Sequence, residues 1–146
     1  METIDFSQIP YSFGMCASDS CVKMSTCLRH IALQYAPVQY SFLPTLTPNK
    51  LAAMDGGSCE YYRSSEKVHY ARGFMRTLNA LSVGVADTFR WRLISYFGRK
   101  NFYLARKGGL LLAPADQQFV IRQARALGLQ CDEYFDAYED SYNWKE

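Results

Sequence analysis

Three of the chain's five cysteines lie within a single short stretch, CASDSCVKMSTC, which runs from Cys16 to Cys27. Thiols crowded in this way are bridged, bound to a metal, reactive or simply buried. The total is odd, and the remaining two are Cys59 and Cys131. The N-terminal sequence METIDFSQIP has neither the basic nor the apolar region of a signal peptide, so we expect reduced, intracellular thiols. The sequence therefore argues against a disulfide framework.

The cysteine spacing allows a zinc site. A structural zinc ion takes four Cys or His ligands in a tetrahedron. Cys16 and Cys21 would lie in a loop and Cys27 at a helix start, where the helix N-terminus stabilises a thiolate. We predict zinc ligands at Cys16, Cys21, Cys27 and Cys59, with His30 as the alternative fourth ligand. The chain lacks a C-x2-C pair, so an iron–sulfur cluster and buried metal-free thiols remain alternatives.

A zinc ion bound in this way would be structural. Its apparent binding free energy, about 10–16 kcal/mol, is comparable with the stability of a whole domain, about 5–15 kcal/mol. Four protein ligands also leave no open position for water. We therefore expect zinc to stabilise the fold without catalysing a reaction, and we interpret Cys131 as a structural thiol.

The predicted fold class is α+β and mainly helical. The length of 146 residues suits one domain, and the composition, 49% hydrophobic and 21% charged, is that of a globular chain. Within this single domain we distinguish a Cys-rich part, residues 1–60, which zinc would stabilise. Residues 61–146 form a helical part with a β-hairpin.

Apolar periodicity and breaker residues place the individual elements. From the N-terminus we predict a helix over 27–35, a short strand over 38–42, a loop over 44–58, helices over 66–80 and 83–97, a β-hairpin with strands 101–105 and 110–113, and a helix over 114–127. An acidic, aromatic tail, CDEYFDAYEDSYNW, follows, and its conformation is left open.

No catalytic motif is present. The chain contains no Gly-rich phosphate loop, no GxSxG and no HExxH. A Cys59–His69 nucleophile pair lacks an orienting third group and oxyanion donors, so no catalytic residue is predicted. We predict a non-catalytic binding or regulatory module. The alternatives are a thiol-dependent enzyme, using a thiolate or a cleft near Tyr61–Arg63, and a metal-free protein-interaction domain.

Basic side chains concentrate in residues 81–130, which carry eight Lys or Arg and two Asp or Glu. Residues 131–146, in contrast, carry one Lys and six Asp or Glu. Two helices followed by a hairpin is the order found in a winged helix-turn-helix, which binds nucleic acid. The alternative is a small core with a solvated basic face. The predicted groove-facing residues are Arg90, Trp91 and Arg92, and the predicted phosphate contacts are Arg99, Lys100, Arg106 and Lys107.

Trp91 projects from the polar face of the helix predicted over 83–97. Its indole could stack on a base, enter a protein interface or pack on the acidic tail. We favour the tail, because its aromatic residues need apolar surface and its carboxylates suit the nearby arginines.

Four segments, CASDSCVKMSTCLRHIALQ, CEYYRSSEKVHYARGF, FGRKNFYLARKG and FDAYEDSYNW, resemble a family of short cysteine-containing bacterial proteins, a domain of unknown function seen mainly in gut anaerobes. The resemblance covers most of residues 11–144. It implies no activity, cofactor or fold, but it favours the four-cysteine site over His30. The shared pattern includes Cys16, Cys21, Cys27, Cys59, Arg29, Tyr62, Arg63, Tyr70, Ala71, Gly73, Phe74, Phe97 and Arg106.

The expected location is the cytoplasm, because no stretch approaches the ~20 apolar residues that span a bilayer. The expected partner is a protein or a nucleic acid, and no membrane partner is predicted.

Overall fold

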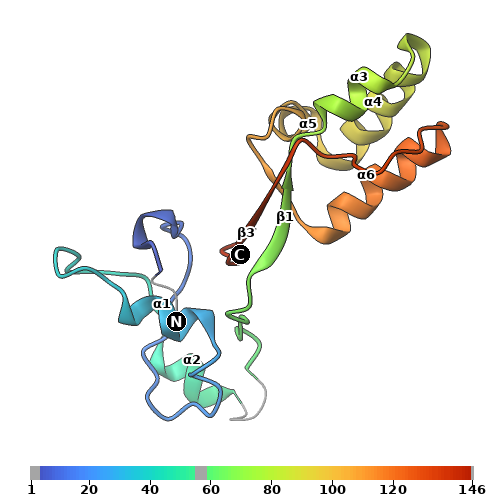
Figure 1. The fold of residues 1–146 in the computed structure, drawn as a ribbon. Helices are drawn as coiled ribbons and strands as arrows, with labels where there is room; N and C mark the ends of the chain where they lie inside the picture. The colour runs from blue at the N-terminus through green and yellow to red at the C-terminus, as the bar shows by residue number, and fades with distance from the viewer. Residues whose placement is uncertain (1–3, 55–58, 146) are drawn as a thin grey trace. The chain divides into compact units, whose positions relative to one another are not determined.

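The computed structural model describes residues 4–54 and 59–145, and the chain divides into two units (Figure 1). The cysteine unit comprises Met1–Lys67 together with Tyr142–Glu146, and the sheet unit comprises Val68–Ser141. The predicted α+β, mainly helical fold class is confirmed. Whether the two units behave as the single domain expected from the chain length stays a prediction.

The described part of the cysteine unit is mainly irregular chain with three short helices, η1 (Phe6–Gln8), α1 (Leu28–Gln34) and α2 (Pro48–Ala53). Helix α1 begins directly after Cys27, as the sequence predicts. Helix α2 falls in the predicted loop, where the Thr47 side chain accepts a hydrogen bond from the Lys50 N–H and caps the helix. Residues 55–58 of that predicted loop lie outside the described residues.

The strand predicted over residues 38–42 is wrong, because this segment is a turn followed by irregular chain. Val38 and Phe42, whose alternation suggested a strand, are 101% and 91% exposed. Their side chains therefore have no buried face to occupy, and burial of alternate residues is what stabilises such a strand.

The core of the cysteine unit joins its N-terminal residues to the chain that returns after residue 141. Trp144 packs edge-on against the buried Phe13, with ring centroids 5.1 Å apart. The guanidinium of Arg63 donates a hydrogen bond to the Asn143 carbonyl (2.7 Å). Residues 142–145 therefore complete this unit. The buried members of the core are Ile4, Phe13, Met15, Leu28, Ile31 and Ala32.

The sheet unit contains a three-stranded antiparallel sheet in the order β2-β1-β3. Strand β1 pairs with β3 along its whole length, from Val68 opposite Ser141 to Arg72 opposite Ala137. The helices of this unit lie toward one end of the strand pair (Figure 1). The elements are β1 (Val68–Arg72), α3 (Met75–Ala80), α4 (Val83–Phe97), α5 (Arg99–Arg106), β2 (Leu111–Leu112), α6 (Pro114–Ala126) and β3 (Ala137–Ser141).

Helices α4 and α6 lie where the sequence predicts them, and their inner faces enter an aromatic core. Phe89 and Leu93 of α4 and Val120 of α6 are fully buried. The rings of Phe74 and Phe89 meet edge-on with centroids 6.1 Å apart, and Phe102 lies 5.8 Å from Phe74. This apolar core holds the helices against the sheet.

The β-hairpin predicted over residues 101–113 is wrong. Residues Arg99–Arg106 form helix α5, which buries Phe102 and Ala105, three positions apart on one helical face. Leu111–Leu112 are extended as predicted, but they pair with β1.

The helix predicted over residues 66–80 is also wrong in its first half. Val68–Arg72 form the central strand β1, and the helix begins only at Met75. Gly73 separates the two elements, since its φ of 75° is compatible with neither a strand nor a helix.

Gly73 is predicted to be intolerant of any side chain. A Cβ at this position would lie 2.6 Å from Oδ2 of Asp136 and 3.3 Å from the Arg106 carbonyl oxygen. Asp136 cannot easily move, because its carboxylate accepts hydrogen bonds from the N–H groups of Met75 (2.9 Å) and Arg76 (3.0 Å) at the start of α3. We expect Gly73→Ala to lower the free energy of unfolding by about 2 kcal/mol or more, measured by urea denaturation.

Gly84 provides the matched control for this substitution. It lies in α4, and an added Cβ would meet nothing within 4 Å. Gly84→Ala is expected to raise the free energy of unfolding by up to about 1 kcal/mol, because alanine has the higher helix propensity. Equal effects of the two substitutions would contradict the steric explanation at Gly73.

Candidate functional site

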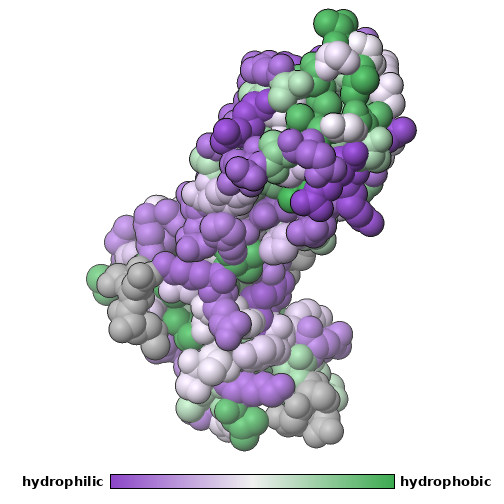
Figure 2. Space-filling model, turned by 45° about the vertical axis from the view of Figure 1, so that its right-hand side comes forward, coloured by the Kyte–Doolittle hydropathy of each residue, from purple (hydrophilic) through white to green (hydrophobic). Residues whose placement is uncertain are grey.

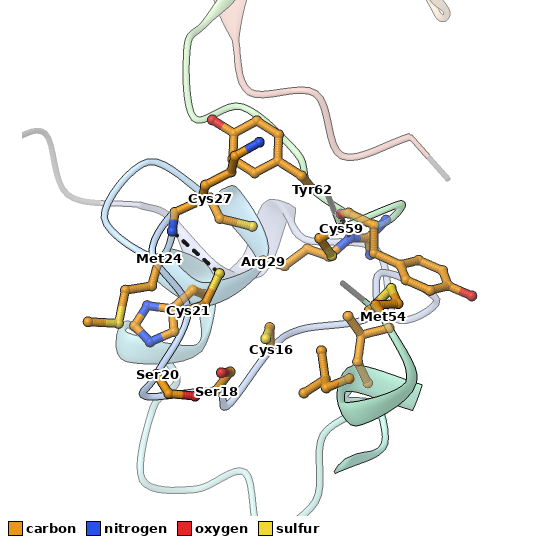
Figure 3. A pocket seen from close by; sticks show the side chains of 15 residues that line it. Cys16, Ser18, Ser20, Cys21, Met24, Cys27, Arg29, Met54, Cys59 and Tyr62 are labelled. Carbon is orange, nitrogen blue, oxygen red and sulfur yellow. Dashed lines mark hydrogen bonds between the residues drawn. The ribbon is translucent and has the colours of Figure 1, made fainter. Parts of the chain in front are cut away.

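Four of the five cysteines line one pocket of the cysteine unit, with a volume of about 140 Å³. In Figure 3 the side chains of Cys16, Cys21, Cys27 and Cys59 surround the same space and come from different segments of the chain. His30, the alternative fourth ligand, lines this pocket as well. The predicted set of metal-binding residues therefore shares one pocket.

All five cysteines are free thiols, and Cys131 is exposed in the sheet unit. Cys16 and Cys27 are buried, whereas Cys21 and Cys59 are partly exposed. Among the residues that the structure describes, no three or more Cys, His, Asp or Glu side chains form a group that could hold a metal ion. The four sulfurs thus share a pocket in an arrangement too open for coordination.

Short stretches of backbone pairing bring the cysteines to this pocket. The N–H of Cys16 donates a hydrogen bond to the carbonyl of Arg29 in α1 (3.2 Å). Cys27 forms an antiparallel bridge with Ser64, five residues after Cys59. Buried backbone groups need such partners, so these contacts fix the Cys16 and Cys27 segments against α1 and residues 59–64.

Arg29 connects three of the cysteine-bearing segments. Its side chain is only 3% exposed. Nε donates to the Tyr61 carbonyl and Nη1 to the Gly14 carbonyl, each at 2.7 Å. The guanidinium also lies 4.7 Å from the centroid of the Phe13 ring. One planar cation at the start of α1 therefore positions the chain two residues before Cys16 and two residues after Cys59.

The turn that carries Cys21 is attached to Tyr62. The N–H of Lys23 donates a hydrogen bond to Sγ of Cys21 (3.4 Å), and hydrogen bonds of this kind orient a metal-binding atom. Nζ of Lys23 lies 5.0 Å from the centroid of the Tyr62 ring, whose hydroxyl is 3.0 Å from Oγ1 of Thr26. The Cys21 sulfur is thus oriented by its own turn.

One wall of the pocket is apolar and comes mainly from the segment around α2, whereas Ser18 and Ser20 add hydroxyl groups elsewhere. An ion pair connects this wall to the Cys59 segment, with Nζ of Lys50 lying 2.8 Å from Oε1 of Glu60. The hydrogen bond and charge of Glu60 raise the pKa of Lys50. Both side chains are exposed, so this pair contributes little stability. The apolar side chains that line the pocket are Met24, Leu46, Leu51 and Met54.

One protein-family model matches almost the whole chain. The model described as "Family of unknown function (DUF6078)" matches residues 1–144. The chain belongs to this family. The DUF6078 match includes all four cysteines of the pocket and most of both units, and it confirms the family resemblance found in the sequence. No curated protein and no solved structure matches the chain. None of the described helices has the length and apolar character needed to cross a membrane.

The residues predicted to contact nucleic acid all lie in the sheet unit, on α4, on α5 and at the end of α5. The winged helix-turn-helix interpretation is wrong, because helix α5 occupies the place of the hairpin. The expected packing of Trp91 on the tail is also wrong. Trp91 is 57% exposed, with the Arg99 guanidinium 5.8 Å from its ring centroid, while Tyr134 and Phe135 of the tail are buried in the core.

The sequence does not predict that Arg29 holds the pocket together. It also does not predict that Lys23, Met24 and Met54 line the pocket. Two features of the sequence do indicate this region. Arg29 and Tyr62 belong to the pattern shared with the family, and a cleft is expected near Tyr61–Arg63. Tyr61 and Tyr62 do line the pocket. His69 belongs to the sheet unit, where its Nδ1 lies 2.7 Å from Oδ1 of Asp140.

Proposed function

We propose that the cysteine unit binds one structural zinc ion through Cys16, Cys21, Cys27 and Cys59, and that the protein is a non-catalytic binding module. The observation that supports this proposal is that three thiols of the stretch 16–27 and the distant Cys59 line a single pocket. A set of sulfur ligands suits zinc, and four of them leave no position for a catalytic water.

Binding would have to draw the sulfurs together. In a tetrahedral site with Zn–S bonds of about 2.3 Å, neighbouring sulfurs lie about 3.8 Å apart. Cys16 and Cys27 are buried, and the backbone contacts described above hold them. Cys21 and Cys59 are partly exposed. We therefore assign Cys16 and Cys27 to a fixed half of the site and Cys21 and Cys59 to the half that moves.

This closure couples metal binding to local folding. A metal site is rarely preformed before the ion arrives, and the binding free energy supplies the cost of ordering the ligands. In the closed pocket the ion would connect the chain that precedes α1, through Cys16, Cys21 and Cys27, with the chain that follows it, through Cys59. Zinc would then stabilise a unit whose described helices are short.

The test is the metal content of the full chain and of cysteine variants, produced in zinc-containing medium. We expect about one zinc ion per chain in the wild type and in Cys131→Ser, whose thiol lies outside the pocket. Cys27→Ser is expected to lose the ion. Cobalt(II) added to the zinc-free protein should give the absorption of a tetrahedral thiolate site. His30→Ala should leave both signals unchanged if Cys59 is the fourth ligand.

Thiol titration of the native protein gives the result that would contradict zinc binding. Thiols bound to zinc react slowly with alkylating reagents, whereas free thiolates react fast. A zinc-free protein in which all pocket thiols alkylate readily would exclude the proposal. One thiol that reacts much faster than the others would instead favour a thiol-dependent enzyme.

A further inference from the structure

We propose that an exposed surface of the sheet unit binds single-stranded nucleic acid. This surface, the Arg–aromatic row, lies on α4 and α5, and it is independent of the cysteine pocket in both its residues and its chemistry. Its exposed members are Trp91, Arg99, Lys100, Tyr103 and Lys107, and the half-buried Arg106 lies beside Tyr103.

Aromatic rings and guanidinium groups alternate along the row. The guanidinium of Arg99 lies 5.8 Å from the centroid of the Trp91 ring, and that of Arg106 lies 4.6 Å from the Tyr103 ring. Arg99 and Tyr103 are four residues apart in α5 and so share one face of the helix. Trp91 and Tyr103 remain 57% and 39% exposed. Two rings are therefore available for stacking, each with a cation beside it.

The charge of the surrounding chain suits an anionic partner. Between residues 88 and 131 the chain carries eight Lys or Arg and a single acidic residue, Asp116. That carboxylate accepts a hydrogen bond from the Tyr96 hydroxyl (2.8 Å), which raises the pKa of Tyr96. Among the described residues, Arg99, Lys100 and Lys107 make no ion pair. Their charges are therefore available to phosphates.

The exposed rings favour a single strand over a duplex. Bases stack on aromatic side chains only when they are unpaired, and this stacking tolerates any base sequence. A winged helix-turn-helix would bind a duplex with one helix in the groove and a hairpin on the phosphates, but the residues expected to begin that hairpin form helix α5. Hydrophilic and hydrophobic residues adjoin each other on the face of the sheet unit seen in Figure 2.

The test is fluorescence anisotropy with a labelled oligothymidine of about 16 nucleotides, at the upper end of single-strand site sizes. We expect the full chain to bind it, with an affinity that falls as salt rises. Trp91→Ala should weaken binding about 5- to 100-fold. Trp91→Phe should retain most of the affinity but lose the quenching of tryptophan fluorescence that binding causes. Lys100→Ala should reduce the salt dependence by about one phosphate contact.

Phe42→Ala is the matched control, because Phe42 is 91% exposed but belongs to the cysteine unit. It should bind as the wild type does. No binding at low salt would overturn the proposal, and so would tighter binding of a duplex of the same length. Equal binding by Trp91→Ala and the wild type would also overturn it, since only charge would then contribute. If the protein produced in zinc-containing medium holds no zinc and still binds the strand, that result supports this proposal and contradicts the proposed zinc function.

Discussion

Removal of zinc is expected to unfold the cysteine unit and to leave the sheet unit folded. This prediction depends on the proposed zinc site, whose apparent binding free energy of about 10–16 kcal/mol would equal or exceed the stability of a small unit. The described helices of the cysteine unit have only three to seven residues, and helices this short are not stable on their own. The sheet unit has a separate core of buried aromatic and aliphatic residues.

Each unit contains one of the two tryptophans, so the two can be followed separately. Trp144 packs against Phe13 in the cysteine unit, and Trp91 lies on α4 in the sheet unit. In a Trp91→Phe background, addition of a chelator should shift the emission of Trp144 towards that of an exposed indole. Helical circular dichroism from α4 and α6 should persist. Excess zinc should restore the Trp144 emission. If the chelator leaves the Trp144 emission unchanged, zinc does not stabilise the cysteine unit.

Replacement of Arg29 by methionine is expected to be the most damaging single substitution in the cysteine unit. The side chain is 3% exposed, and its hydrogen bonds reach the Tyr61 and Gly14 carbonyls. Hydrogen bonds from a charged group contribute about 1.5–3 kcal/mol each, so loss of the two should lower the free energy of unfolding by about 3–6 kcal/mol. Two cysteine-bearing segments would also lose their side-chain hydrogen bonds to α1, so zinc content should fall with stability.

Two substitutions give this experiment its controls. Arg29→Lys keeps the charge but not the planar fork that reaches two carbonyls, so it should recover only part of the loss. Arg90→Met removes an arginine whose guanidinium lies 2.8 Å from Asp87 on the surface of α4, and it should cost less than about 1 kcal/mol. If Arg29→Met unfolds at the same urea concentration as Arg90→Met, Arg29 does not organise the pocket.

The elements that the sequence predicts well are those with a strong local pattern. Helix α4 follows from apolar residues at helical spacing between a serine and Gly98, and α6 follows from Pro114 at its first turn. The sequence does not predict helix α5, because NFYLA looks like the apolar run of a short strand. In the structure its buried residues, Phe102 and Ala105, are three positions apart, which is a helical spacing. Helix α2 was missed although Thr47 and Pro48 form a regular helix start.

Strands β1 and β3 form by pairing with each other, although they lie far apart in the sequence. A local sequence pattern cannot show which distant segment a strand pairs with. The residues of β3 are largely exposed and two of the five are acidic, so nothing in Ala137–Ser141 alone indicates a buried strand. The same limit applies to the site. The cysteine spacing suggested a shared site, and the thiols do share a pocket. The position of Arg29 depends on the Gly14 and Tyr61 carbonyls, which lie 15 and 32 residues away in the chain.

The pairing of Val68 with Ser141 marks the two points at which the chain passes between the units. The sheet unit is thus inserted into the cysteine unit, whose core needs Tyr142 and Trp144. During translation the sheet unit is complete at Ser141, while the segment made first must wait for residues 142–145 to leave the ribosome. The cysteine-bearing segment therefore lacks part of its core until the whole sheet unit has been made.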